Sequence, residues 1–403
     1  MPDPRVLLSH EWLVVYAGSE RCVEQFRHEF PHARLLTTLF EPGRLPAAFS
    51  GAEPSLLQRI PRATDHHEWL VPLMPAAWRL RRRVTDVDVV VSSSHACAKA
   101  VRVARGTAHV CYCHTPMRYA WEYELERERF PRWTRPLVGP LMRAMRRWDL
   151  RKAAAVDIFC ANSRDVAERI RTHYKRDARV VYPPVDTDLF TPGEAPREDY
   201  FLYTGRFVAY KRPDLVVEAF RELPDLRLRM VGSGPMEAEL RARATPNIEF
   251  LGAVDDEALR EEYRRARAMV FCAHEDFGIV MAEAQACGTP VIALAKGGAL
   301  DIVDDGVTGW LIADQDPALL RAAVMTAAST DLDATHISAR AQRFSRARFR
   351  AEMRAIVDEA LTAKGSSRAP SRRGLSGGES GYRADLPAVA PRTMPDGSAD
   401  RDG

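Results

Sequence analysis

The sequence predicts an α/β protein with two Rossmann-like domains that face each other across a cleft. Short β-branched runs alternate with helical periods along the chain, which is typical of parallel sheets covered by helices on both faces. A stretch rich in proline and acidic residues, VYPPVDTDLFTPGEAPRED (181–199), separates two sets of such runs. The length of 403 residues also favours two domains over one.

The expected strands fall into two groups. The first group is RVLLS (5–9), ARLLTTL (33–39), DVDVVVSSS (86–94), AHVCYC (108–113), VDIFCANS (156–163) and ARVVYPP (178–184). The second group is YFLYTG (200–205), LRLRMVG (226–232), NIEFLG (247–252), ARAMVFCA (266–273) and TPVIAL (289–294). We therefore expect a first domain over 1–184, a hinge over 185–199 and a second domain over 200–345.

The end of the chain separates into a helix and a tail. Apolar residues recur at helical spacing from Phe349 to Leu361, which predicts a helix over 346–364 that packs back on the first domain. Residues 365–403 are dense in Gly, Ser, Pro and Arg, and they lack the apolar surface that would order them. We expect a disordered tail with no catalytic part.

The net charge of +3 hides an asymmetry between the two halves. Residues 1–184 hold 30 Lys and Arg against 20 Asp and Glu, whereas the remainder holds 28 against 35. The first domain therefore faces something anionic, either a phosphorylated substrate or a membrane surface. No nucleic-acid-binding module accompanies the charge, so nucleic acid is a poor candidate. The basic amphipathic stretch 132–152 fits both membrane contact and a packed helix with a solvated basic face.

Cysteine usage and hydropathy predict a cytoplasmic protein without a structural metal. The seven cysteines are scattered, and Cys111 and Cys113 are spaced for one face of a strand rather than for a zinc site. No apolar run approaches the ~18 residues of a membrane span, and no signal peptide precedes the first strand. Three Asp-x-Asp triplets, at 86–88, 186–188 and 331–333, are interpreted as turn and cap acids rather than metal ligands.

Polar residues follow the strands of the second group at the edge where parallel sheets bind ligands. Gly205 and Arg206 come directly after one strand, and Lys211 lies just before a helix that Pro213 is placed to open. The forked guanidinium of an arginine and the ammonium of a lysine suit a diphosphate. Two solvated cations in a loop without a ligand would give the same sequence pattern. Gly232 fits a tight strand-to-helix turn, and Gly252 leaves backbone free to approach a flat ring.

The stretch HEDFGIVMAEAQACGTPV (274–291) carries two acids around a helix start. Gly278 lets the backbone approach a ligand, and the N–H groups of Ile279 and Val280 would point at an anion. Glu275 and Glu283 should lie roughly 8–12 Å apart. That is wider than the about 5–5.5 Å of a retaining glycosidase pair. The two acids suit the two ends of a bound nucleotide-sugar. The alternative without a ligand is that the helix dipole favours an acid at the N-terminus and that the second acid is solvated on the helix surface.

These motifs together resemble family 4 retaining glycosyltransferases of the GT-B fold. The resemblance rests on the E-x7-E stretch at 275–283, KGGAL (296–300), GVTGWL (306–311), GRFVAYKRPDLVVEAF (205–220) and PPVDTDLF (183–190). HTPMRYAWE (114–122) further resembles the O-antigen mannosyltransferase branch, which uses GDP-mannose. The resemblance implies a metal-independent hexosyltransferase of cell-surface polysaccharide or glycolipid synthesis. It implies a nucleotide-sugar donor as co-substrate and no further cofactor.

The resemblance also assigns roles to individual residues. Arg206 and Lys211 would neutralise the diphosphate leaving group, Glu275 would bind the donor sugar and Glu283 the ribose. The remaining donor-binding positions implied are Gly18, Gly205, Gly232, Gly252, Phe277, Gly278, Ile279 and Val280. His114 is expected to orient and polarise the acceptor hydroxyl, and Ser19, Arg118 and Tyr119 are expected on the acceptor side. In the implied mechanism the departing phosphate takes the acceptor proton.

Three other interpretations compete with this one, and the sequence argues against the third. A UDP-sugar can replace GDP-mannose as the donor, because pocket shape rather than sequence pattern selects the base. A non-catalytic scaffold of the same fold would bind glycan or lipid without turning over a donor. An oxidoreductase would need the third glycine of a dinucleotide fingerprint, and Met236 and Glu237 stand at that place. The partners expected are the donor, a saccharide or lipid-linked saccharide acceptor, and an anionic inner membrane face.

Overall fold

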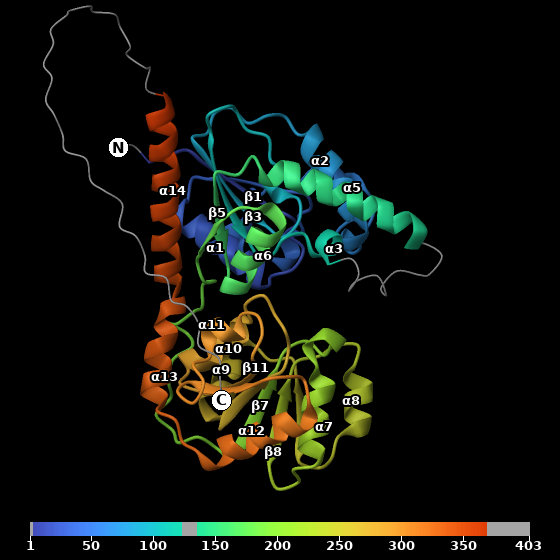
Figure 1. Cartoon of the computed structure of the whole chain (residues 1–403), viewed down its shortest axis with the longest axis vertical. Helices are drawn as coiled ribbons and strands as arrows, with labels where there is room; N and C mark the ends of the chain where they lie inside the picture. Colours follow the sequence, from blue (N-terminus) through green and yellow to red (C-terminus); the bar gives the residue numbers. More distant parts are fainter. Residues whose placement is uncertain (1–2, 123–134, 369–403) are drawn as a thin grey trace, which may run out of the picture. The chain divides into compact units, whose positions relative to one another are not determined.

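The computed structural model describes residues 3–122 and 135–368, and nearly all of them belong to one compact unit. The expected tail beyond residue 368 and the first part of the basic stretch, 132–134, lie outside the described residues. Two parallel six-stranded sheets organise the described chain, one on each side of residues 185–199 in the sequence (Figure 1).

The first sheet has the spatial order β2-β1-β3-β4-β5-β6. Its strands are β1 Val6–His10, β2 Arg34–Thr37, β3 Val89–Ser94, β4 Ala108–Cys113, β5 Ile158–Ala161 and β6 Ala178–Val180. Its helices are α1 Gly18–Glu29, α2 Met74–Leu80, α3 Arg118–Trp121, α5 Arg135–Ala153 and α6 Arg164–Tyr174. The short 3-10 turns are η1 Pro42–Arg44, η2 Ala47–Phe49, η3 Leu56–Arg59, η4 His67–Leu73 and η5 Ala98–Ala100. Every strand pairs in parallel, so the carboxyl ends share one edge.

The second sheet has the order β12-β11-β10-β7-β8-β9. Its strands are β7 Tyr200–Thr204, β8 Arg227–Val231, β9 Ile248–Gly252, β10 Ala268–Phe271, β11 Val291–Leu294 and β12 Gly309–Ile312. Its helices are α7 Pro213–Arg221, α8 Glu237–Arg243, α9 Asp256–Arg265, α10 Ile279–Ala286, α11 Ala299–Ile302, α12 Pro317–Ser329 and α13 Ala334–Ala341, with η7 Ala209–Lys211 and η8 Gln342–Phe344. The strand β12 was not predicted, because its four residues include a glycine and carry no long β-branched run.

The central strands are buried on both faces, which explains their continuous apolar runs. In the first sheet, Leu8 and Val91 pack in a cluster on one face, whereas Leu7 and Val90 pack in a cluster on the other. The second sheet is likewise covered by two apolar clusters. Since helices cover both faces of each sheet, the open edge at the carboxyl ends is where polar side chains can gather.

The last helix returns to the first sheet. The residues that lead into it pair with Val185 of the segment between the two sheets. The N–H of Val185 donates to Phe344 O at 2.8 Å, and its carbonyl accepts from Arg346 N at 3.2 Å. Helix α14 spans Arg346–Arg368 (Figure 1). Its apolar face, which includes Phe349 and Met353, packs in the same cluster as Leu8 and Val110. This helix therefore contributes to the core of the first sheet although it follows the second.

Candidate active site

The carboxyl edge of the second sheet holds an ion pair between two of the predicted site residues. Lys211 Nζ lies 2.7 Å from Glu275 Oε1, and the two side chains are only 13 and 20% exposed. Lys211 ends the turn η7 after β7, whereas Glu275 lies in the loop after β10. The partly buried pair keeps an ammonium and a carboxylate ready at the strand ends, and both would be available to a polar ligand.

Arg206 does not join this pair in the structure. Its guanidinium is exposed, and Nη2 donates to Tyr210 Oη at 2.9 Å. Lys211 and Arg206 lie on the same loop between β7 and α7, but the side chain of Arg206 is directed at a neighbouring residue of that loop. The predicted convergence of the two cations on one diphosphate therefore stays a prediction, which requires a rotation of an exposed side chain.

Helix α10 begins at the same edge and presents free backbone donors. Gly278 caps its N-terminus with φ of 83°, a left-handed conformation that favours glycine. Within the described part of the chain, the N–H groups of Ile279 and Val280 make no hydrogen bond, as expected for the first turn of a helix. The ring of Phe277 is 4% exposed and stacks on Tyr182, so this predicted donor-site residue packs in the core and offers backbone only.

Glu283 is a buried acid on α10. It is 3% exposed, and Tyr263 donates to its Oε2 at 3.4 Å while Arg21 Nη1 contacts its Oε1 at 3.3 Å. Burial raises the pKa of Glu283 to about 7, although the charge of Arg21 opposes this shift. With a pKa of about 7, part of Glu283 is ionised at neutral pH. Because few protein groups donate to it, its carboxylate can accept hydrogen bonds from ligand hydroxyls.

Three predicted glycines shape the strand ends of the second sheet. Gly205, Gly232 and Gly252 all adopt positive φ, at 149°, 132° and 75°. A Cβ atom on Gly232 would lie 2.0 Å from the carbonyl oxygen of Gly205, and Gly232 N donates to Gly252 O at 2.7 Å. Gly232 is therefore required by the close approach of backbone segments, which accounts for it without a ligand.

The loop of Glu275 rests on a second glycine turn that we did not predict as part of the site. Gly298 N donates to Glu275 O at 3.0 Å. A Cβ atom would lie 2.2 Å from Glu275 O at Gly297 and 2.3 Å from Phe277 Cα at Gly298. The two glycines thus fix the backbone that carries Glu275, and their signal was present in the KGG sequence at 296–298.

On the first sheet, His114 follows β4 and lies at its carboxyl edge. It is partly exposed, and its Nε2 lies 2.8 Å from Ser93 Oγ. Desolvation first, and then the nearby His95 and His10, hold the pKa of His114 well below its usual range. The imidazole is therefore neutral at pH 7, which fits a group that orients a hydroxyl rather than one that carries a positive charge.

The glycine loop before α1 lies at the same edge of the first sheet. Gly18 begins the helix, and nothing lies within 4 Å of the position that its Cβ would take. Ser19 Oγ donates to Glu20 Oε2 at 3.0 Å, so this predicted acceptor-side residue is engaged by a neighbouring acid. The open space at Gly18 is compatible with a ligand that approaches the helix start.

Arg118 and Tyr119 begin the short helix α3. Arg118 Nη2 donates to Asp276 Oδ1 at 3.0 Å, and Arg169 also forms an ion pair with Asp276. Asp276 directly follows Glu275, so this predicted acceptor-side arginine reaches the loop that carries the donor-side acid. Tyr119 is partly buried against an apolar cluster of the first sheet. Asp276 escaped prediction because its partners are distant in sequence.

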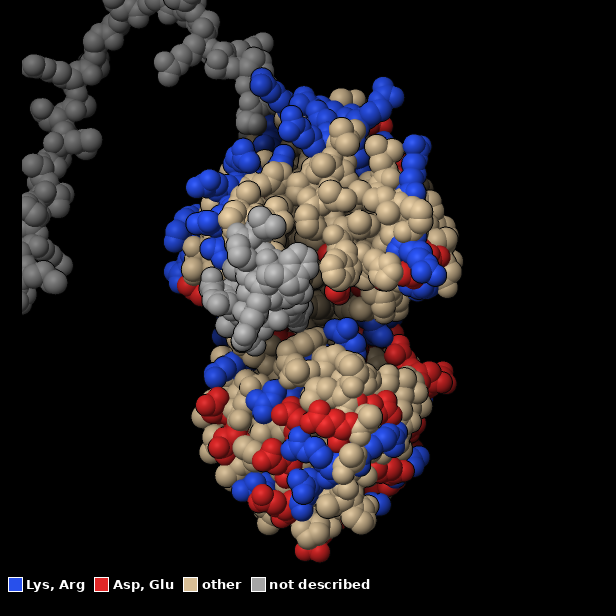
Figure 2. All heavy atoms as spheres, turned by 90° about the vertical axis from the view of Figure 1, so that its right-hand side faces the viewer, with Lys and Arg blue, Asp and Glu red and all other residues tan. Residues whose placement is uncertain are grey.

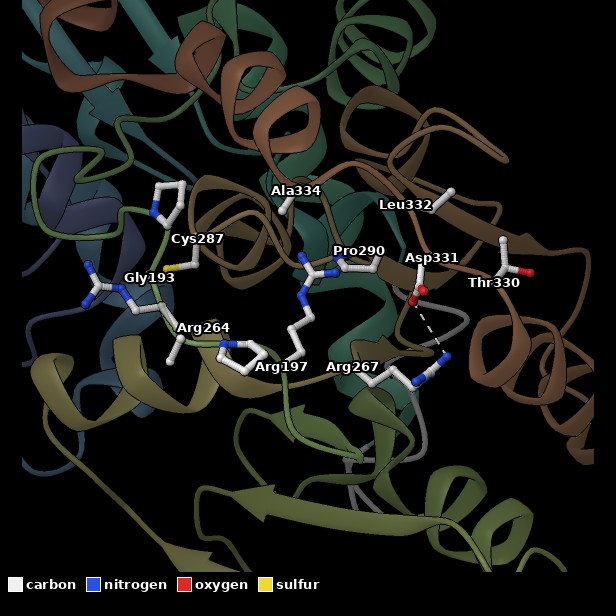
Figure 3. Close-up of a pocket in the computed structure, with 13 residues that line it drawn as sticks. Gly193, Arg197, Arg264, Arg267, Cys287, Pro290, Thr330, Asp331, Leu332 and Ala334 are labelled. Carbon is white, nitrogen blue, oxygen red and sulfur yellow. Dashed lines mark ion pairs between the residues drawn. The ribbon is translucent and has the colours of Figure 1, made fainter.

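No group of three or more His, Cys, Asp or Glu among residues 3–122 and 135–368 is arranged to hold a metal ion. A cavity of about 390 Å³ lies elsewhere, lined by residues of the 185–199 segment and of the loop before α13 (Figure 3). Protein groups engage its arginines: Arg197 donates to Gly288 O, and Arg264 donates to Thr191 O at 2.7 Å. Its lining contains none of the predicted site residues.

Two sequence families match the chain, one over each half, and their matches overlap at 185–189. Residues 16–189 match Glycosyltransferase Family 4, and residues 185–344 match Glycosyl transferases group 1. Residues 16–344 therefore belong to these glycosyltransferase families. The predicted family is confirmed, and the GT-B fold class is confirmed with it. The O-antigen branch stays a prediction.

Similar glycosyltransferases are named for D-inositol 3-phosphate and not for O-antigen mannosyl transfer. A D-inositol 3-phosphate glycosyltransferase of Geodermatophilus obscurus is 40% identical over 203 residues, which are 42% of this chain and 45% of that protein. One from Mycobacterium sp. (strain KMS) is 35% identical over 185 residues, 40% of this chain and 42% of that protein. The chain thus matches less than half the length of these relatives.

Solved glycosyltransferase structures share the fold at low identity. Anabaena Alr3699/HepE in complex with UDP and glucose is 17% identical, with a TM-score of 0.65 over 88% of this chain and 100% of that chain. Sucrose-phosphate synthase from Thermosynechococcus elongatus is 19% identical, with a TM-score of 0.67 over 89% of this chain and 100% of that chain. At such identities the likeness establishes the fold alone.

Proposed function

We propose that the chain transfers a hexose from a nucleotide-sugar to an acceptor hydroxyl, with retention at the anomeric carbon. The observation that carries this proposal is the Lys211–Glu275 pair beside the amino end of α10, with the buried Glu283 on the same helix. A diphosphate would lie against the free N–H groups of Ile279 and Val280, with Lys211 as its counter-charge. Glu275 would then accept from the sugar hydroxyls and Glu283 from the ribose.

The reaction in this proposal needs no protein base. The bond between the anomeric carbon and the diphosphate oxygen breaks, and the acceptor oxygen bonds to the same face of that carbon. The departing phosphate oxygen takes the proton of the acceptor hydroxyl, so a nucleoside diphosphate and a glycoside are the products. Lys211 and Arg206 would stabilise the negative charge that develops on the leaving group. His114 would orient the hydroxyl without abstracting its proton.

Two donor classes compete for this site. GDP-mannose is favoured by the resemblance of residues 114–122 to the mannosyltransferase branch. A UDP-sugar is favoured by the fold shared with Anabaena HepE, whose structure contains UDP and glucose. A thermal-shift screen of GDP-, UDP- and ADP-sugars distinguishes the two, because a ligand at 100 times its Kd stabilises the native state by about 2.7 kcal/mol. Product analysis with the stabilising donor then tests transfer itself.

The acceptor in this proposal carries phosphate. The excess of basic residues before Pro184 favours an anionic acceptor, and the similar proteins are named for D-inositol 3-phosphate. A sugar or polyol phosphate and a lipid-linked pyrophosphate share this chemistry. Transfer assays with each class distinguish them. Binding of a donor without transfer to water or to either acceptor class would instead favour the non-catalytic scaffold.

The basic surface around α2 and α5 supports a peripheral membrane location on the inner face. Trp69, Leu73 and Leu80 are 83, 48 and 69% exposed, on η4 and α2, which contact each other. Eight arginines on or next to α2, on α5 and in the segment before β4 are exposed: Arg79, Arg82, Arg83, Arg102, Arg105, Arg143, Arg147 and Arg151. In Figure 2, Lys and Arg predominate over Asp and Glu on the upper half of the face shown. The pKa of Lys152 is lowered by partial burial first and then by the charges of Arg102, Arg151 and Arg79. These cations therefore lie close together with few acids to offset their charge.

Exposed apolar and basic side chains together suit an anionic bilayer surface. No helix of the described residues is long and apolar enough to cross a bilayer. Flotation with vesicles of anionic or zwitterionic lipid tests this location. We expect recovery with anionic vesicles and loss of recovery in Trp69→Ser/Leu80→Ser. Equal recovery with both lipids would contradict an electrostatic membrane contact.

A further inference from the structure

The segment 89–101 exposes one side chain at the carboxyl edge of the first sheet. All of its residues are buried except His95, which is partly exposed. Ser94 pairs with Cys113 in the parallel register of β3 and β4, so the next residues at the two strand ends are His95 and His114. The centroids of these two imidazole rings lie 6.4 Å apart. His95 therefore lies beside the histidine that is expected on the acceptor side.

A buried acid holds the backbone that carries His95. Glu11 is 0% exposed, and its carboxylate accepts from the N–H groups of four consecutive residues, 95–98, at 2.8–3.2 Å. Both of its oxygens accept from these donors, an arrangement that favours the ionised form. A buried carboxylate with this many partners makes the turn after β3 rigid. The backbone position of His95 is therefore set before any ligand arrives.

Aromatic packing, rather than hydrogen bonding, holds the ring of His95. It meets the ring of Trp12 edge to face, with centroids 4.7 Å apart and an interplanar angle of 76°. Among residues 3–122 and 135–368, no group forms a hydrogen bond with either ring nitrogen of His95. These nitrogens are also not among the fully buried polar atoms that lack a partner, so they reach the surface. His95 thus offers hydrogen-bonding groups that the described part of the chain leaves unused.

The surroundings of His95 favour a hydroxyl as its partner. Burial lowers the pKa of His95, and the negative charge of Glu11 offsets this shift only in part, so the imidazole is neutral at pH 7. A neutral imidazole has one donor and one acceptor nitrogen, and a hydroxyl can bond to either of them whichever tautomer is present. Two rings whose centroids lie 6.4 Å apart can hold two neighbouring hydroxyls of one sugar or polyol ring.

We propose that His95 binds a second hydroxyl of the acceptor, next to the hydroxyl that reacts, and thereby selects acceptors that carry a vicinal diol. This inference rests on the proposed transferase function, which makes the acceptor a sugar or polyol. The second hydroxyl is not the nucleophile, so no bond to its oxygen forms or breaks and its hydrogen stays on it throughout the transfer. His95 acts by holding the acceptor ring in one orientation, and it is a specificity-determining residue.

The test combines variants of the protein with a change in the acceptor. His95→Phe keeps a flat ring that can pack on Trp12 and removes both nitrogens, whereas His95→Gln keeps a donor and an acceptor. His67→Phe is the matched control, because His67 also packs on Trp12, with centroids 4.9 Å apart. The value of kcat/KM is measured with the acceptor that wild type glycosylates and with its deoxy analogue, which lacks the hydroxyl next to the reacting one.

We expect His95→Phe to lower kcat/KM for the full acceptor by about tenfold, the effect of one lost hydrogen bond, with donor Kd unchanged. With the deoxy acceptor, wild type and His95→Phe should be equal, because the partner of the imidazole is already missing. His95→Gln should recover part of the loss, and His67→Phe should behave as wild type. Equal losses with the two acceptors, or equal losses in His95→Phe and His67→Phe, would show a packing role and overturn the proposal. Wild-type activity of His95→Phe would overturn it as well.

A binding experiment separates this proposal from the proposed function. The ring ¹H–¹³C signals of His95, assigned with His95→Gln, are followed during titration with myo-inositol and with methyl α-mannoside. We expect these signals to shift with at least one of the two polyols. If wild type transfers no sugar, the proposed function fails, and a shift of the His95 signals would still show a polyol site beside His114. Unchanged signals with both polyols would then exclude that site too.

Discussion

Arg21 and Glu283 form an ion pair at 3.3 Å although 262 positions separate them in the sequence. The same guanidinium contacts Asp256 at 3.3 Å. In the proposed function Glu283 binds the donor ribose, so Arg21 of α1 holds this carboxylate before a donor arrives. The charge of Arg21 also limits how far burial raises the pKa of Glu283.

We predict that Arg21→Met weakens donor binding at pH 7 and has less effect near pH 9. The substitution keeps the aliphatic stem and removes the nearest positive charge, so the pKa of Glu283 rises further and more of the acid is protonated at pH 7. We expect a threefold to tenfold increase in donor Kd, about 0.7–1.4 kcal/mol. Calorimetric titration with the donor identified by thermal shift measures it. Arg171→Met, on the exposed face of α6, is the control. An unchanged Kd would refute the role of Arg21.

The raised pKa of Glu283 makes stability depend on pH. Its pKa in the folded protein is about 7 against an ordinary 4.5, so protonated Glu283 contributes stability that is fully present below pH 4.5 and is lost as the pH rises through 7. Relative to Glu283→Gln, wild type should lose about 2 kcal/mol between about pH 5.5 and pH 7.5. Urea unfolding at both pH values measures the difference. Exposed Glu257→Gln should follow wild type. Parallel curves for wild type and Glu283→Gln would exclude the shift.

The partly buried pair of Lys211 and Glu275 gives a prediction on catalysis. Lys211→Ala should lower kcat by about 100-fold, because removal of one preorganised group that faces developing charge has an effect of this size. Glu275→Gln should instead raise the donor KM, because it keeps the shape and loses the acceptor charge. Steady-state kinetics with the identified donor separate the two effects. Arg221→Ala, an exposed cation at the end of α7, should leave both constants unchanged. Full activity of Lys211→Ala would remove this residue from the site.

Gly232 allows a test of backbone packing at the strand ends. Gly232→Ala combines a φ of 132° with a Cβ atom 2.0 Å from Gly205 O, so the backbone must move. We expect a loss of about 2–4 kcal/mol in the free energy of unfolding, measured with urea. Gly306→Ala is matched, because φ is also positive at 71° but nothing lies within 4 Å. It should cost only about 1 kcal/mol. Equal losses of unfolding free energy in the two variants would mean that the positive φ, rather than the contact with Gly205, causes the destabilisation.

The strands were predictable from the sequence because they are buried on both faces and therefore read as continuous β-branched runs. Ten of the described strands lie inside the predicted ranges, β1 runs one residue beyond its range, and β12 was missed. The acids at 275 and 283 and the glycine at 278 were found because ligand groups follow the strands in open parallel sheets. Side-chain directions were not predictable. Arg206 turns to Tyr210, and Phe277 turns into the core.

Two groups of residues show why the remainder escaped prediction. Arg21 and Asp276 have partners more than 100 positions away, and one sequence contains no signal for such pairs. His10 and Ser93 are different. His10 ends β1 and Ser93 lies near the end of β3, so the strand-end rule that we applied to the second sheet and to His114 would have found both.

The first sheet also contains a buried ion pair. Lys99 Nζ lies 2.6 Å from Asp149 Oδ1, and their side chains are 1 and 0% exposed. Trp121 Nε1 and Tyr174 Oη donate to Asp149 Oδ2 at 2.8 and 2.7 Å, and Lys99 also donates to Ala96 O at 2.7 Å. Asp149 thus connects α5 to η5, to α3 and to α6. The position of α3 matters because that helix carries the predicted acceptor-side residues.

We predict that Asp149→Asn costs about 3–5 kcal/mol in the free energy of unfolding, because it leaves the Lys99 ammonium buried without a counter-charge. Lys99→Met should cost a similar amount for the opposite reason. The double variant Lys99→Met/Asp149→Leu leaves neither charge buried, so it should be more stable than either single variant. Urea unfolding gives the double-mutant cycle. Losses that simply add would show that the two groups are not coupled. In that case the pair does not hold α3, and acceptor KM should be unchanged in Asp149→Asn.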